Sequence, residues 1–202
     1  MYKVFKYTAE NKIEWDHFIA TAKNATFLFQ RDFMDYHQDR FEDFSLMVYK
    51  NETLYALLPA NKKNEVVYSH QGLTYGGLLL NNSAKLKQTF EAFKEIIKFL
   101  FENGILKLEV RLIPPFYNKL PSDELEYLFF KAAARLIKRD VVLLIDYHHQ
   151  LPFQKNRREG INKAKRKNLV VKTDDNYDLF WNEVLIPNLS SKYNTAPVHS
   201  LE

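Results

Sequence analysis

The sequence predicts an α/β fold of the mixed α+β kind, in which a largely antiparallel sheet is flanked by helices. Residues 44–58 carry the clearest hairpin signal, because Phe44–Tyr49 and Leu54–Leu58 are two runs of strand-forming residues around the turn 50–53. Residues 86–101 carry the clearest helical signal, an apolar residue at every third or fourth position with Lys and Glu between them. Short apolar runs that recur between helical stretches complete the pattern.

The first part of the chain is expected to hold a strand and two helices. Lys3–Tyr7 favours a strand, and Asn11 favours the cap of a helix whose third residue is Glu14. Arg31–Phe41 favours a second helix. The side chains expected to face the core are Trp15, Phe18, Ile19 and Ala22 in the first helix and Phe33, Tyr36, His37 and Phe41 in the second.

The middle of the chain is expected to alternate helices and strands. Ser83 is expected to cap the longest helix, which ends at Asn103-Gly104. Ile105–Ile113 alternates and predicts a strand, and Val141–Ile145 predicts a short interior strand after a further helix capped by Ser122. The buried stripes are expected to be Leu86, Phe90, Phe93, Ile97 and Leu100 in the longest helix and Leu125, Leu128, Phe129, Ala132 and Leu136 in the next.

Val66–Leu80 predicts two short strands joined by a loop that carries three of the chain's five glycines. Glycine lets the backbone approach a neighbouring group closely, so this loop is a candidate wall of a substrate cleft. Its candidate contact residues are His70, Tyr75, Gly76 and Gly77. The alternative is a plain connection whose glycines supply positive φ angles and whose Tyr75 fills the core.

Composition excludes several kinds of chemistry. A chain of 202 residues with 46% hydrophobic residues can build a core, and the absence of cysteine excludes disulfides, thiol nucleophiles and thiolate metal sites. Asp35, His37 and Asp39 are two residues apart on a predicted helix and point in different directions, so no metal site is predicted. The sequence has neither a signal peptide nor an apolar run that could span a membrane, and the cytoplasm is the expected location.

Beyond residue 150 the character of the sequence changes. The net charge of the chain is +4, and Lys155–Lys167 alone carries +6, so the basic charge is one local feature. A basic helix over 156–167, a strand over 169–172 and a helix over 177–189 are expected there. We therefore expect a first domain over residues 1–150 and, over residues 151–202, a helix–strand–helix fragment that is too small for its own core. Its apolar face, formed by Val170, Phe180, Trp181 and Leu185, predicts that the fragment docks on the first domain or on a second copy of the chain, giving a homodimer.

Several runs of the sequence resemble one family. They are TFLFQRDFMDYHQDRFEDFSLMVYKN, LPAN, SHQGLTYGGLLL, KLEVRLIPPFY and FWNEVLIPNLSSKYNTAPVHSLE, and the resemblance extends over essentially the whole chain. They resemble the bacterial FemAB-like acetyltransferases of the GNAT superfamily, which are related to the FemABX peptidoglycan aminoacyltransferases. In that family two GNAT-like domains stand in tandem, so the resemblance implies a complete first domain over residues 1–150 and, over residues 151–202, the start of a second domain that opens with Arg157-Arg158.

The resemblance implies acyl or aminoacyl transfer to an amine or hydroxyl of a cell-wall or surface-polysaccharide precursor, with acetyl-CoA, another acyl-CoA or aminoacyl-tRNA as donor. It adds Arg111, Arg157 and Arg158 to the candidate contact residues, since arginine forks suit carboxylate and phosphate groups. No segment matches the Arg/Gln-x-x-Gly-x-Gly/Ala loop that holds coenzyme A in relatives, and no catalytic residue is indicated. Two other functions stay open: a non-catalytic acceptor-binding or interaction module, and tRNA binding through residues 155–167.

Overall fold

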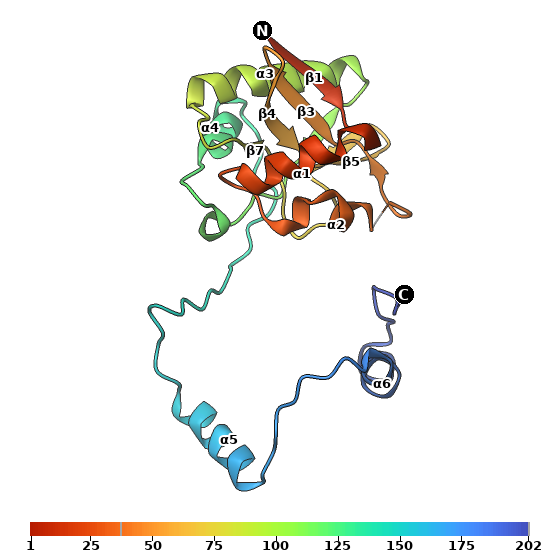
Figure 1. The fold of residues 1–202 in the computed structure, drawn as a ribbon, viewed down its shortest axis with the longest axis vertical. Helices are drawn as coiled ribbons and strands as arrows, with labels where there is room; N and C mark the ends of the chain where they lie inside the picture. The colour runs from red at the N-terminus through yellow and green to blue at the C-terminus, as the bar shows by residue number, and fades with distance from the viewer. Residues whose placement is uncertain (37, 202) are drawn as a thin grey trace. The chain divides into compact units, whose positions relative to one another are not determined.

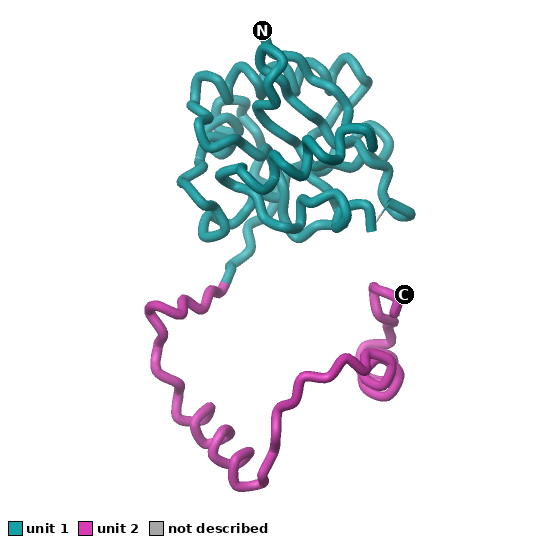
Figure 2. Tube along the Cα trace, in the orientation of Figure 1, with its two compact units in different colours: residues 1–142 teal, residues 143–202 magenta. Residues whose placement is uncertain are grey.

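The computed structural model describes residues 1–36 and 38–201 and divides the chain into two compact units, Met1–Val142 and Leu143–Glu202 (Figure 2). His37, which was expected to face the core, lies outside the described residues.

Unit 1 is a mixed α/β domain with two four-stranded sheets (Figure 1). The first sheet has the order β1-β3-β4-β7 and is antiparallel throughout; the second has the order β2-β5-β6-β8, and its β6–β8 pair is parallel. This architecture confirms the predicted fold class. The strands are β1 (Tyr2–Lys6), β2 (Glu42–Asp43), β3 (Leu46–Lys50), β4 (Thr53–Leu58), β5 (Asn61–Lys63), β6 (Val66–Tyr68), β7 (Leu79–Leu80) and β8 (Lys107–Glu109).

Helices cover both faces of the first sheet. Figure 1 shows α1 (Lys12–Thr21) crossing one face of β3 and β4 and α3 (Leu86–Glu102) running along the other. Side chains alternate along β3, so Met47 packs with Trp15 and Ile19 of α1, whereas Leu46 and Val48 pack with the buried side of α3. The smaller helices are α2 (Arg31–Asp35), α4 (Glu124–Lys131) and the 3₁₀ turns at Ala9–Asn11, Phe27–Phe29 and Pro115–Tyr117.

The predicted hairpin is confirmed. β3 and β4 pair antiparallel from Lys50 opposite Thr53 to Leu46 opposite Leu58. Asn51 and Glu52 both have positive φ, 49° and 73°, as a two-residue hairpin turn that matches the strand twist requires. The predicted face of the first helix is confirmed as well, since Trp15, Phe18, Ile19 and Ala22 are buried; the Asn11 side chain, however, accepts from Thr8 and does not cap α1.

The predicted stripe of α3 is wrong in part. Phe93 and Leu100 are buried, but Leu86, Phe90 and Ile97 are about four-tenths exposed, and the remaining buried positions are Thr89, Ala92 and Ile96. The apolar residues of α3 cover a wider arc than the sheet can bury, and the two small residues let the helix approach the sheet on that side. The helix begins at Leu86 after Lys85 rather than at Ser83.

Three further elements differ from the predictions. The second helix spans Arg31–Asp35 only, and Phe33 and Tyr36 are exposed while Arg31 and Met34 are buried. α4 ends at Lys131, which leaves Ala132 and Leu136 exposed. Val141–Ile145 belongs to no strand and is exposed, because a run of strand-forming residues becomes a strand only where a neighbouring strand accepts its hydrogen bonds.

Unit 2 consists of two helical segments joined by extended chain. They are α5 (Lys155–Arg166) and a continuous helix over residues 177–193 made of α6 (Tyr177–Phe180), a π-helical turn (Trp181–Leu185) and α7 (Ile186–Tyr193). Both predicted helices are confirmed, whereas the expected strand over 169–172 is absent from the described residues of this unit. None of these helices has a buried residue.

Candidate functional site

The glycine-bearing loop between β6 and β7 is fastened to the chain that follows β8. Ser69 N donates to the Glu109 carbonyl at 2.9 Å, and Gly76 N donates to the Arg111 carbonyl at 2.7 Å. In return Arg111 N donates to Ser69 Oγ at 2.9 Å, and Gly76 forms a parallel bridge with Leu112. All of these residues belong to the two runs SHQGLTYGGLLL and KLEVRLIPPFY, so the structure brings together the loop and the strand that the sequence singled out separately.

Gly76 and Gly77 are required for two different reasons. A Cβ on Gly76 would overlap the backbone carbonyl oxygen and side chain of Ser69, so the close approach of loop and strand needs a residue without a side chain. Gly77 has a φ of +119°, and a Cβ there would also meet Leu125 of α4 at 3.1 Å. Both positions shape the backbone of the loop.

The structure places Tyr75 in the core of unit 1. The side chain is 6% exposed, its hydroxyl donates to Thr26 Oγ1 at 3.1 Å, and its ring lies 5.1 Å from that of Tyr117 and 6.0 Å from that of Phe29. This position matches the alternative that the sequence left open, a tyrosine that fills the core.

His70 is also buried, at 5% exposure, and its ring packs edge-on against Phe41 with 5.7 Å between centroids. Its φ of 64° lies in the left-handed region, so the chain turns sharply there. Asn61 fixes the following residue, since Asn61 Oδ1 accepts from Gln71 N at 2.6 Å. The loop therefore presents Gln71 and Thr74, which are exposed, and keeps its two aromatic candidates inside.

Arg111 is the candidate whose side chain reaches solvent beside this loop. Its Nη1 donates to the Thr74 carbonyl at 3.3 Å, which holds the guanidinium over the loop surface. A guanidinium has five N–H donors in a fixed fork, so this position can bind a carboxylate or phosphate group in a bidentate manner. Lys107 and Glu109 of β8, the strand that precedes Arg111, pair with each other at 2.7 Å.

Arg157 and Arg158 lie on α5 in unit 2, and both are exposed. Their backbone N–H groups donate to the Gln154 carbonyl at the start of the helix, at 3.0 and 3.1 Å. Both side chains thus project from a regular helix of unit 2, whereas the loop belongs to unit 1.

In unit 1, a small cavity lies beside this loop and a larger groove lies elsewhere. A cavity of about 20 Å³ is lined by Gly76, Leu112 and Asn118 among others, which is space for a single water molecule. A groove of about 680 Å³ lies along the β1–β3 side, lined by Lys3, Phe5 and Tyr49 among others. The Tyr49 hydroxyl donates to Glu14 at 2.5 Å, and burial together with this carboxylate raises the Tyr49 pKa. The sequence did not indicate this groove, although the alternation Lys3, Phe5 along β1 placed both residues on one face.

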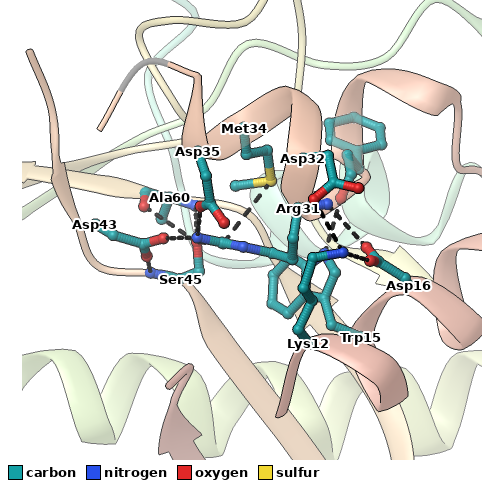
Figure 3. Close-up of polar contacts among 11 residues, drawn as sticks. Lys12, Trp15, Asp16, Arg31, Asp32, Met34, Asp35, Asp43, Ser45 and Ala60 are labelled. Atoms are coloured by element: carbon teal, nitrogen blue, oxygen red, sulfur yellow. Dashed lines mark hydrogen bonds and ion pairs between the residues drawn. The ribbon is translucent and has the colours of Figure 1, made fainter. Parts of the chain in front are cut away.

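A cluster of charged side chains surrounds Arg31 (Figure 3). Arg31 is 2% exposed, pairs with Asp43 and with Asp35, and lies over the Tyr7 ring with 3.8 Å between the guanidinium carbon and the ring centroid. Burial lowers its pKa, the two carboxylates raise it, and the net pKa lies above the ordinary arginine value. Arg31 therefore stays charged and fastens α2 to β2.

Residues 1–36 and 38–201 contain no group of three His, Asp or Glu side chains placed to hold a metal ion. No described helix is long and apolar enough to cross a bilayer.

Comparison with known proteins gives distant structural likenesses. No family model matches the sequence, and no curated protein matches it. Among solved structures, the chain is similar to the ribosomal-protein-S18-alanine N-acetyltransferase from Escherichia coli, with 11% identity and a TM-score of 0.38 over 54% of this chain and 64% of that one. It is also similar to the protein TTHA1254 from Thermus thermophilus, with 15% identity and a TM-score of 0.39 over 75% of this chain and 99% of that one. The match spans less than two thirds of the Escherichia coli enzyme, and likenesses at these scores say nothing about activity.

Proposed function

We propose that the chain is part of an acyltransferase of the GNAT, FemAB-like type, which transfers an acyl or aminoacyl group to an amine or hydroxyl of a cell-envelope precursor. One observation supports this more than any other. The runs around residues 69–80 and 107–117, which carry the resemblance to that family, are hydrogen-bonded to each other through Ser69, Gly76 and Arg111. Motifs that are distant in sequence and adjacent in space are expected of one site.

In this proposal unit 1 holds the acceptor, and Arg111 binds its anionic part. Acyl transfer of this type is a direct attack of the amine or hydroxyl on a thioester or ester, which needs close placement of the reactants, a proton acceptor and donors for the oxyanion. It forms no covalent intermediate with the protein, so a chain without cysteine can carry it out. The donor is acetyl-CoA, another acyl-CoA or aminoacyl-tRNA.

The absence of cysteine gives the proposal a clean assay. Coenzyme A released from acetyl-CoA is the only source of thiol in the reaction, so an Ellman reagent reports transfer without a background from the protein. We expect thiol release that depends on both the chain and an amine-bearing nucleotide sugar, and a product heavier by one acetyl group in mass spectrometry. Thiol release at the same rate without the sugar contradicts transfer to this acceptor class.

The second candidate function is a non-catalytic module that binds the acceptor. The burial of His70 and Tyr75 favours it, because neither side chain of the loop then reaches a reacting group. Binding of the nucleotide sugar without acetyl transfer, under conditions where the chain is folded, supports the module over the enzyme.

A further inference from the structure

Unit 2 has exposed side chains and no core of its own. None of the residues of α5 or of the helix over 177–193 is buried, and the apolar ones remain largely in contact with solvent. Helices of this length are marginal in water without a surface to pack on. Their chemical character therefore indicates what surface they fit.

The helix over 177–193 is amphipathic. Most of its apolar side chains recur every three or four residues on one face, at Tyr177, Phe180, Trp181, Val184, Leu185 and Leu189, while Leu179 and Ile186 lie on the other side. Asp178, three residues before Trp181, borders this face, and Glu183 lies on the opposite side. Pro187 cannot donate a backbone hydrogen bond to the Glu183 carbonyl, and the helix takes up a π turn over Trp181–Leu185 directly before it.

α5 is basic on nearly every side. Residues 155–167 include seven Lys and Arg residues and one Glu. Every residue in this range except Ala164 is exposed. Lys155 lies 4.0 Å from Glu159, which offsets one charge. Residues 155–167 contain no aromatic side chain, so α5 has charge for a polyanion but no ring on which a nucleic-acid base could stack.

We propose that unit 2 binds the surface of an anionic lipid bilayer. The positive charges of α5 attract the headgroups, and the apolar face of the helix over 177–193 enters the interface, where Trp, Tyr and Phe are favoured. Glu183 on the opposite side stays in water. A nucleic acid would use the charges and leave the apolar face uncovered. A second copy of the chain, one of the two occupants expected from the sequence, would bring a second basic helix of the same sign. The proposal does not depend on the acyltransferase function.

The two tryptophans make the test direct. Trp15 is fully buried and donates its indole N–H to the Phe29 carbonyl at 2.8 Å, so a change in emission on adding vesicles reports Trp181. We expect the full chain to co-sediment with vesicles that contain phosphatidylglycerol, with a blue shift of Trp emission, and to remain in solution with neutral phosphatidylcholine vesicles. Because these charges act through a screened field, a salt concentration of about 0.5 M should release the chain.

Two matched variants separate charge from folding. Replacing Lys163, Lys165 and Arg166 by Gln should weaken vesicle binding by on the order of 100-fold, since each basic residue near the surface contributes about fivefold in affinity. Replacing Lys85, Lys87 and Lys94 of unit 1 by Gln removes as much charge elsewhere and should leave binding unchanged. Equal binding to neutral vesicles or an equal loss in both variants would overturn the proposal. So would tRNA binding at the same protein concentration without vesicle binding.

Discussion

At the scale of single residues, Gly76 is the position where the candidate site depends most directly on backbone geometry. A methyl group there would overlap the Ser69 carbonyl, which belongs to the strand-to-loop junction and cannot rotate away. Gly76→Ala should therefore lower the free energy of unfolding by about 1–3 kcal/mol, the usual cost of inserting a methyl group into a filled space. Urea unfolding measures it. Gly160→Ala, where nothing lies within 4 Å, is the matched control, and an equal effect of the two changes would show that Gly76 has room.

Arg31 is the second residue whose chemistry is specific. Its planar fork contacts Asp35, Asp43 and Ser45 while its face lies over Tyr7, an arrangement that an ammonium group cannot copy. Arg31→Lys should cost about 1–3 kcal/mol of stability although it keeps the charge. Asp32→Asn, which removes an exposed partner of Lys12, should cost less than about 1 kcal/mol. Chemical denaturation measures the loss of unfolding free energy in each variant. Similar losses in the two variants would contradict a special role for the guanidinium.

Single residues also show why part of the site could be predicted and part could not. Gly76 and Arg111 stand out in the sequence because glycine pairs and charged strand faces are local patterns. Whether Tyr75 points into a cleft or into the core depends on Thr26, Phe29 and Tyr117, which are far from it in the sequence. No local pattern contains that information.

At the scale of elements, the chain between α1 and α2 is tied to the start of α4 by a buried ion pair. Lys23 Nζ contacts Glu124 and donates to the Pro121 carbonyl at 3.3 Å, and Lys119 N donates to the Lys23 carbonyl at 2.7 Å. Glu124→Gln should cost about 3–5 kcal/mol, because it leaves a buried ammonium without its partner. The double change Lys23→Met and Glu124→Leu should recover at least half of that loss. A double-mutant cycle of Lys23→Met and Glu124→Leu, measured by urea unfolding, gives the coupling energy between the two side chains. Additive losses of stability would contradict the coupling.

The same scale explains which elements the sequence predicts well. The β3–β4 hairpin and α1 are determined by local turn chemistry and by one continuous buried face, and both were predicted correctly. α3 was placed correctly but its buried side was not, because its apolar residues cover more of its surface than β1, β3 and β4 can cover. Val141–Ile145 failed as a strand for the complementary reason, since strand formation needs a partner edge that the run itself does not specify.

At the scale of the whole molecule, the two units differ in kind. Unit 1 contains both hydrophobic clusters, whereas residues 132–154 are exposed and contain no helix or strand. Trypsin should therefore cut first at Arg135, Lys138 or Arg139 and leave a fragment that retains the circular dichroism and urea midpoint of unit 1. Mass spectrometry of the digest identifies the cuts. Equally rapid cleavage within α3, for example at Lys94, would contradict an independently folded first unit.

Acceptor binding at Arg111 is the central claim, and one titration tests it. Calorimetry with UDP-N-acetylglucosamine, a nucleotide sugar with two phosphates, should give saturable binding to the full chain. Arg111→Ala should raise Kd at least tenfold, about 1.4 kcal/mol, because it removes a charged fork that sits over the loop. Lys107→Ala, in β8 just before Arg111 and already paired with Glu109, should leave Kd unchanged. Binding that is unaffected by Arg111→Ala, or that falls equally in both variants, would contradict the account.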